Sequence, residues 1–236
     1  MTRLSKTEKI AKKLFVISLG GSLIVPDEID VQFLNNFKKL IESQTKKDNR
    51  FILITGGGKT CRKYQAALSQ ITKVDNTTLD WLGIYSTRFN AQLVRLMFGK
   101  LAHRALAENP AKKIDFKAKV LIAAGWEPGS STDLDAVELA KTYGAKTVIN
   151  LSNIDYLYNK DPRKFKNAAR IEIISWDGLL KITGRKWVPG RNVPFDPVAA
   201  KFAQKNNLEV IIANGKNLKN LENILESKKF KGTKIS

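Results

Sequence analysis

The chain has 236 residues, with 41 Lys and Arg against 22 Asp and Glu, which gives a formal net charge of +19. A hydrophobic content of 43% is enough for a sizeable core and excludes global disorder. The single Cys excludes an internal disulfide framework and fits a reducing compartment, so we expect a cytoplasmic protein. The high charge fits nucleic acid, an anionic surface, phosphorylated ligands or a generally basic surface.

Most of the excess charge lies in three segments. Residues 1–13 and 216–236 each carry a net +4, and residues 160–191 carry a net +6. These segments show neither exposed aromatics interleaved with basic residues nor a known RNA-binding signature, so nucleic acid is an unlikely partner. We interpret them as solvated termini and a basic surface loop.

The start of the chain imitates a secretory signal peptide. A basic extension, residues 1–13, precedes the uncharged and mostly apolar run Leu14–Val25. Gly20 and Gly21 interrupt this run, no small-residue cleavage pattern follows it, and it is shorter than the ~20 residues that a membrane span needs. We therefore expect a soluble, uncleaved protein, without a membrane partner, that begins with a buried strand.

Hydrophobic periodicity and turn signals predict alternating strands and helices. In chain order the predicted elements are a strand at Leu14–Leu19, a helix at Val31–Ile41, a strand at Phe51–Ile54, a helix from about Lys59, a long helix at Leu79–Ala107 that includes His103, a strand at Val120–Ala124, a helix at Asp133–Tyr143, a strand at Thr147–Leu151, a helix from Pro197 to about Lys205 capped by Asp196, a strand at Val210–Ala213, a helix at Leu218–Leu225, and an edge strand in the tail Gly232–Ser236. Strands separated by helices form right-handed crossovers. The pattern predicts an α/β fold, a three-layer αβα sandwich with a mainly parallel central sheet, as one domain spanning residues 1–236.

Glycine-containing turns follow three of the predicted strands. They lie at residues 20–21, 56–58 and 125–129. Ligands of open α/β sheets bind beyond the carboxyl ends of the strands, where glycines let the backbone approach an anion closely. The residues Gly56–Thr60 lack the earlier glycine of a Walker motif, and no dinucleotide fingerprint is present. The sequence therefore predicts a phosphate site of another type.

Taken together and in order, the motifs resemble the archaeal-like uridylate (UMP) kinases of the amino-acid kinase superfamily. The resemblance runs from about Leu14 to Thr233. The motifs that carry it are Gly20-Gly21-Ser22, Gly56-Gly57-Gly58-Lys59 with Arg62-Lys63-Tyr64, Asp80 with Gly83-Ile84 and Thr87-Arg88-Phe89-Asn90-Ala91, Pro128-Gly129 with Ser131-Thr132-Asp133, Asn153-Ile154-Asp155 with Tyr158, Asp161-Pro162, and Phe195-Asp196-Pro197-Val198-Ala199-Ala200.

This resemblance implies an amino-acid kinase fold and transfer of the γ-phosphoryl group of ATP to UMP, with Mg²⁺, in a homo-oligomer that is commonly a hexamer. Asp133 and Arg62 are the implied catalytic residues. The implied ATP contacts are Gly21, Ser22, Gly58, Arg62, Ser152, Asn153, Tyr158 and Asp161. The implied UMP contacts are Gly57, Asp80, Gly125, Trp126, Glu127, Pro128, Gly129, Ser130, Ser131 and Thr132. No residue is assigned as a direct metal ligand.

Three positions depart from the wider superfamily pattern. Ser18 stands where many members have a Lys, Trp126 interrupts the usual Gly-Gly-Thr, and Tyr156 replaces a turn glycine. Asp133 could instead act only as a helix cap, and Trp126 and Tyr156 could narrow the base pocket or simply pack. Two further interpretations remain open: a superfamily kinase for another small molecule, and a catalytically weak regulator that binds nucleotide or RNA.

Overall fold

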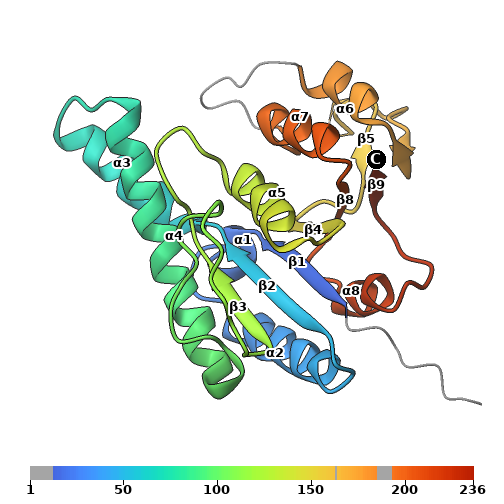
Figure 1. Cartoon of the computed structure of the whole chain (residues 1–236). Helices are drawn as coiled ribbons and strands as arrows, with labels where there is room; N and C mark the ends of the chain where they lie inside the picture. The colour runs from blue at the N-terminus through green and yellow to red at the C-terminus, as the bar shows by residue number, and fades with distance from the viewer. Residues whose placement is uncertain (1–12, 163, 185–192) are drawn as a thin grey trace, which may run out of the picture.

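The computed structural model describes residues 13–162, 164–184 and 193–236. It contains a seven-stranded sheet in the order β3-β2-β1-β4-β8-β9-β7 (Figure 1). The strands are β1 (Leu14–Leu19), β2 (Arg50–Thr55), β3 (Val120–Ala123), β4 (Thr147–Ser152), β7 (Ile173–Ile174), β8 (Glu209–Asn214) and β9 (Thr233–Ile235). The five strands from β3 to β8 are all parallel, which confirms the prediction of a mainly parallel sheet.

Helices cover both faces of the sheet and make the three layers. The helices are α1 (Gly21–Ile24), α2 (Val31–Thr45), α3 (Gly58–Ile71), α4 (Asn76–Phe98), α5 (Thr132–Tyr143), α6 (Trp176–Thr183), α7 (Pro197–Lys205) and α8 (Leu218–Leu225). One core joins the sheet to α5, α6 and α7, and the other joins it to α1, α2, α4 and α8. The central strands are buried on both faces, which explains their continuous apolar sequences.

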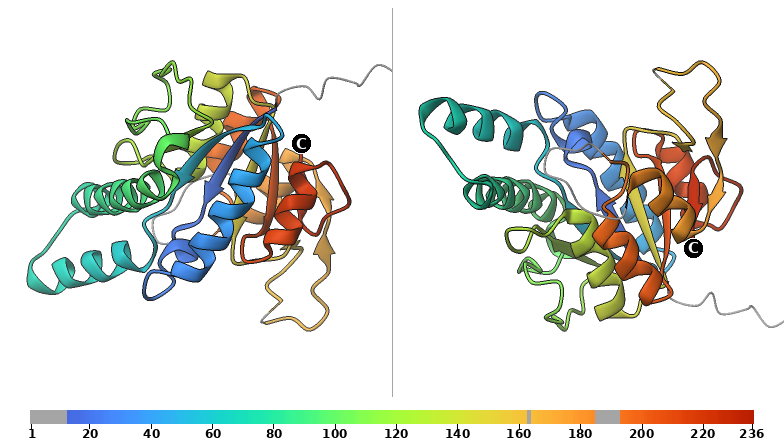
Figure 2. Two further views of the ribbon diagram at one scale, coloured as in Figure 1. Left: turned by 90° about the horizontal axis from the view of Figure 1, so that it is seen from below. Right: turned by 90° about the horizontal axis from the view of Figure 1, so that it is seen from above.

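Helix α3 is the exception to this layering. Among its residues only Gly58 is buried, and α3 reaches away from the sheet together with the first part of α4 (Figure 2). These two helices pack on each other, so the first turn of α3 lies close to α4.

The structure corrects the predicted long helix. Helix α4 starts at Asn76, after Asp75 accepts a hydrogen bond from the Thr78 backbone N–H at 2.7 Å, and it ends at Phe98. Gly99 follows with a φ of 53°, a conformation that favours glycine and ends the helix. His103 is therefore not helical, and its backbone N–H donates to the Val120 carbonyl of β3 at 2.8 Å.

The carboxyl-terminal third contains elements that the sequence patterns did not reveal. Strand β6 (Arg170–Ile171) and helix α6 lie within the segment interpreted as a surface loop, and β6 pairs with β5 (Leu157–Tyr158) in a two-stranded hairpin. The tail does join the sheet, but as an antiparallel neighbour of β8, and β7 lies outside it at the edge. The basic extension lies outside the described residues except for Lys13.

Candidate active site

The first two glycine turns pack main chain against main chain at the carboxyl ends of β1 and β2. A Cβ atom on Gly21 would lie 2.1 Å from the backbone nitrogen of Gly58, and one on Gly56 would lie 2.6 Å from the nitrogen of Gly21. Gly58 also has a φ of 66°. Side chains cannot fit at these three positions, so an anion can approach the main chain of the turns closely. The Gly56 N–H already donates to the Leu19 carbonyl at 3.1 Å, so the N–H groups expected to suit phosphate oxygens are those of Gly21 and Gly58.

Arg62 follows Cys61 in α3, and Asp80 lies on the neighbouring helix α4. Burial raises the pKa of the Cys61 thiol; the Arg62 charge opposes this rise and the Asp80 charge adds to it. Arg62 is exposed on the second turn of α3 and forms no hydrogen bond or ion pair with any residue that the structure describes. Its guanidinium is therefore available for an anion beside the second glycine turn.

The third turn is the loop of residues 125–131 between β3 and α5, which we call the nucleotide loop because the sequence predicts that it contacts the nucleotide. Helix α4 holds it through Thr87, whose hydroxyl accepts from the Gly125 N–H at 2.8 Å, and through Asp80, which accepts from the Gly129 N–H at 2.9 Å. Arg88 of α4 donates to the carbonyls of Gly125 and Trp126 at 3.4 Å and 3.2 Å. The structure thus brings Asp80 together with the loop that was expected to share its ligand.

Asp133 joins three elements at the carboxyl edge of the sheet. Its carboxylate accepts from the Asn150 amide of β4 at 2.9 Å and from the Asp196 backbone N–H, before α7, at 3.0 Å. Burial raises its pKa to about 6, the Asp196 charge adds to this, and the two hydrogen bonds oppose it. The cap of α5 is Ser131, so Asp133 is not the helix cap.

The remaining expected ATP contacts fall into two groups. Ser152 ends β4 and Asn153 follows it, at the same edge of the sheet as the glycine turns, and the Ser152 carbonyl accepts from the Gly215 N–H at 2.9 Å. Tyr158 and Asp161 lie instead in or beside the β5–β6 hairpin, which projects on the other side of the molecule from α3 (Figure 2). The contact of these two residues with ATP stays a prediction.

The departures from the family pattern have simple structural settings. Ser18 is 5% exposed and lies beside Asn150 in the sheet register, so two polar side chains stand at the ends of neighbouring central strands. Tyr156 is buried, with the Arg170 guanidinium 5.3 Å from its ring centre, which indicates packing. Sequence reasoning gave no role to Asn150, Arg88 or Asp135, although a polar Asn within an apolar strand is a signal for the first.

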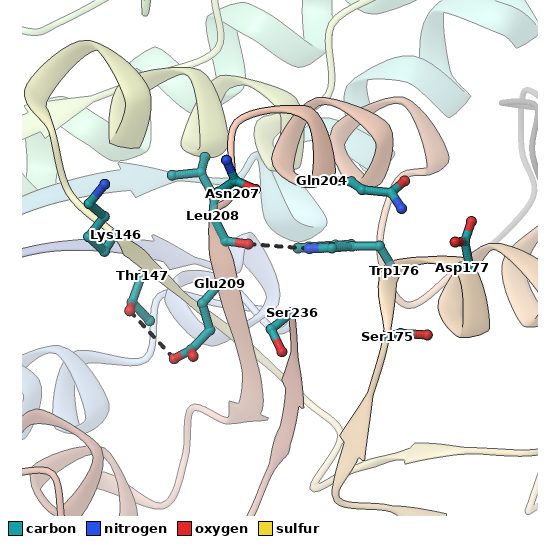
Figure 3. Close-up of a pocket in the computed structure, with 10 residues that line it drawn as sticks. All are labelled: Lys146, Thr147, Ser175, Trp176, Asp177, Gln204, Asn207, Leu208, Glu209 and Ser236. Carbon is teal, nitrogen blue, oxygen red and sulfur yellow. Dashed lines mark hydrogen bonds between the residues drawn. The ribbon is translucent and has the colours of Figure 1, made fainter.

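A cavity of about 520 Å³ lies away from this site (Figure 3). It opens at the amino ends of the strands, where Thr147 starts β4 and Glu209 starts β8, and the Trp176 indole N–H donates to the Leu208 carbonyl at its wall. None of the expected site residues lines it. Ligands of parallel sheets bind at the opposite end, so we do not assign the reaction to this cavity.

Comparison with known proteins agrees with the geometry. Residues 13–214 match the model of the amino acid kinase family. The chain belongs to this family. It is 36% identical to the uridylate kinase of Thermoplasma volcanium over 90% of this chain and 93% of that protein, and 34% identical to that of Thermococcus onnurineus over 90% and 95%.

A solved structure extends this similarity to three dimensions. The uridylate kinase of Archaeoglobus fulgidus superposes with a TM-score of 0.81 at 29% identity, covering 95% of this chain and all of that one. The amino acid kinase fold expected from the sequence is confirmed.

Proposed function

We propose that this protein is a uridylate kinase, which transfers the γ-phosphoryl group of ATP to the phosphate of UMP and releases UDP and ADP. The observation that carries the proposal is the convergence of three glycine-containing turns at neighbouring strand ends with Arg62 and Asp80 beside them. The uridylate kinase relatives, similar along nearly the whole chain, support the same activity. The full chain would then act as one amino-acid kinase domain in cytoplasmic pyrimidine nucleotide synthesis.

The two nucleotides would meet at the paired glycine turns. Backbone N–H groups of Gly21, Ser22 and Gly58 would hold ATP phosphates, with Ser152 and Asn153 beyond β4 on the adenosine side. Gly57, Asp80 and the nucleotide loop would hold UMP. Tyr158 and Asp161, in and beside the β5–β6 hairpin, would line the adenosine pocket.

The reaction needs alignment and charge neutralisation more than acid–base chemistry. A phosphate oxygen of UMP attacks the γ-phosphorus, a new P–O bond forms, and the bond to the bridging oxygen of ADP breaks. Arg62 supplies a planar cation for the equatorial oxygens. Asp133 would fix the start of α7 and the Asn150 amide relative to the phosphates, through the hydrogen bonds that its carboxylate accepts from both.

Mg²⁺ would enter with ATP. The described residues contain no group of three His, Cys, Asp or Glu side chains that could hold a metal ion. Few protein ligands are needed for an ion that is held mainly by phosphate oxygens and water, which is the usual coordination of Mg²⁺ in such enzymes. The ion would neutralise phosphate charge, and we assign no ligand of this chain to it.

Self-association is the second part of the proposal. Helix α4 exposes Trp81, Tyr85, Phe89 and Leu96, with Phe89 74% exposed and Leu96 65% exposed. Their spacing of four and seven residues places these side chains on one face of α4. Such a stripe marks a protein interface, and we propose a second copy of the chain as its partner, within the hexamer implied by the family resemblance.

Among the described helices, none has the length and apolar character that crossing a membrane requires.

A coupled assay of ADP production with UMP, CMP and dUMP as acceptors tests the activity. We expect UMP to be the preferred acceptor. No turnover with UMP above background, together with RNA binding at physiological salt, would refute the kinase proposal and favour a regulatory nucleic-acid-binding role.

A further inference from the structure

One buried carboxylate holds the nucleotide loop from the side of α5. Asp135 is fully buried, and its Oδ1 atom accepts from the Ser130 hydroxyl at 2.6 Å while its Oδ2 atom accepts from the Trp126 N–H at 3.3 Å. The two donors are four residues apart in the loop. A single side chain therefore fixes both ends of the segment that should enclose the acceptor nucleotide.

No other contact explains why this carboxylate is buried. Ser131 caps α5, and Asp135 makes no ion pair with any cation in the part of the chain that the structure describes. Burial raises its pKa to about 7, and the like charges of Glu138 and Glu127 add to the rise, while the bonds from Ser130 and Trp126 oppose it. A buried carboxylate without a cation lowers the stability of the fold. The two hydrogen bonds to the loop are therefore the function that we assign to this side chain.

The same peptide is held from the other side by α4. Arg88 donates to the Gly125 carbonyl at 3.4 Å, while Asp135 accepts from the Trp126 N–H of the same peptide group. Arg88 is itself paired with Glu108 at 3.2 Å. The peptide at Trp126 is thus fixed at both polar ends by charged side chains from two helices.

We propose that Asp135 is a positioning residue for the acceptor nucleotide, which sets the shape of the nucleotide loop through the Trp126 N–H and the Ser130 hydroxyl. This rests on the proposed function of the loop as the UMP site. Asp135 lies beneath the loop and does not touch the reacting atoms. The charged groups that act on it are Glu138 on its own helix and Glu127 in the loop. Arg88 of α4 is engaged with the loop carbonyls, and Asp196, before α7, is engaged with Ser131.

The first test is steady-state kinetics of Asp135→Asn, a variant of nearly equal size without the charge. Weakening the two charge-assisted hydrogen bonds should raise the KM for UMP about tenfold at pH ~8 and leave kcat and the KM for ATP within about twofold. The gap between wild type and variant should shrink toward pH ~6, where Asp135 itself becomes protonated. Asp133 titrates in both proteins, so the comparison removes its effect.

Glu138→Gln is the matched control, since it removes an acid of the same helix whose pKa is also raised by burial but which does not contact the loop. It should leave all three constants unchanged. Ser130→Ala removes the hydroxyl that donates to Asp135 without changing a side chain of the core. It should raise the KM for UMP. The double variant Asp135→Asn with Ser130→Ala should raise the KM by less than the product of the two single effects, because both substitutions disrupt the same hydrogen bond between Ser130 and Asp135.

Hydrogen exchange of the Trp126 amide without nucleotide gives a readout that does not depend on activity. It should be faster in Asp135→Asn than in wild type and unchanged in Glu138→Gln. An unchanged KM for UMP in Asp135→Asn, multiplicative effects in the double variant, or equal exchange of Trp126 would each overturn the inference. Failure of the wild type to bind UMP would instead refute the proposed function, and with it the role of Asp135 in acceptor binding.

Discussion

Replacing Asp135 by Asn should make the protein increasingly stable relative to wild type as the pH rises to neutral and alkaline values, although the same change should weaken acceptor binding. In the unfolded chain this carboxyl has an ordinary pKa of 3.8, and in the folded protein burial raises the pKa to about 7. The unfolded state therefore loses its proton first as the pH rises, so ionisation progressively lowers the stability of the folded state between these values. Above pH ~7 the loss is complete, and a side chain that cannot ionise avoids it.

The size of the effect follows from the two pKa values. Their difference corresponds to ~4 kcal/mol in full, since each tenfold change in proton affinity is worth 1.36 kcal/mol. Part of this is already lost at pH ~4.5, so the difference in unfolding free energy between Asp135→Asn and wild type should grow by ~3 kcal/mol between pH ~4.5 and pH ~8. Any fixed effect of the amide, favourable or not, is the same at both pH values and cancels.

Urea unfolding at the two pH values measures this difference. With a denaturant dependence of ~3 kcal/mol per molar, the midpoint of the variant should move upward relative to wild type by ~1 M from the lower to the higher pH. Glu138→Gln should show a much smaller change, because that side chain is less buried. An equal midpoint difference at both pH values would show that Asp135 does not carry its charge in a buried environment, and would refute the predicted pH dependence.

Three further outcomes are expected. Arg62→Ala should lower kcat/KM by ~100-fold with an unchanged fold, whereas Arg95→Ala, remote on α4, should have no effect; equal kinetics for both would remove Arg62 from the site. Gly58→Ala should cost several kcal/mol of unfolding free energy because its Cβ would meet a backbone oxygen at 2.4 Å, whereas Gly144→Ala, also at positive φ but with open space, should cost only ~1 kcal/mol; similar thermal denaturation of the two would contradict the packing of the turns. Phe89→Glu should reduce the assembly size in light scattering, and an unchanged mass would exclude the α4 stripe as an interface.

Much of the fold could be predicted from the sequence because the parallel strands are buried on both faces. Strands β1, β2, β3, β4 and β8 are continuous apolar runs bounded by turns, and such runs have few alternatives. The end of α4 was harder to place. The residues after Phe98 include good helix formers, and only the positive φ of Gly99 shows where the helix stops.

The candidate site divides in the same way. Glycine turns are visible in a sequence because steric exclusion leaves no other residue possible, and the structure shows this exclusion directly for Gly21 and Gly58. Asp135 could not be recognised, because an acid in the first turn of a helix is commonly exposed and favoured by the helix dipole. Its burial depends on the nucleotide loop folding over it, which is a tertiary event.

The contrast between the turns bears on how such an enzyme could be redesigned. The spacing of the first two turns is fixed by main-chain atoms in contact, so no side-chain replacement there can change that spacing. The nucleotide loop, by contrast, is held by the exchangeable side chains of Asp80, Arg88 and Asp135. Under the proposed function, engineering a new acceptor specificity should therefore begin with those three positions and leave the first two turns unchanged.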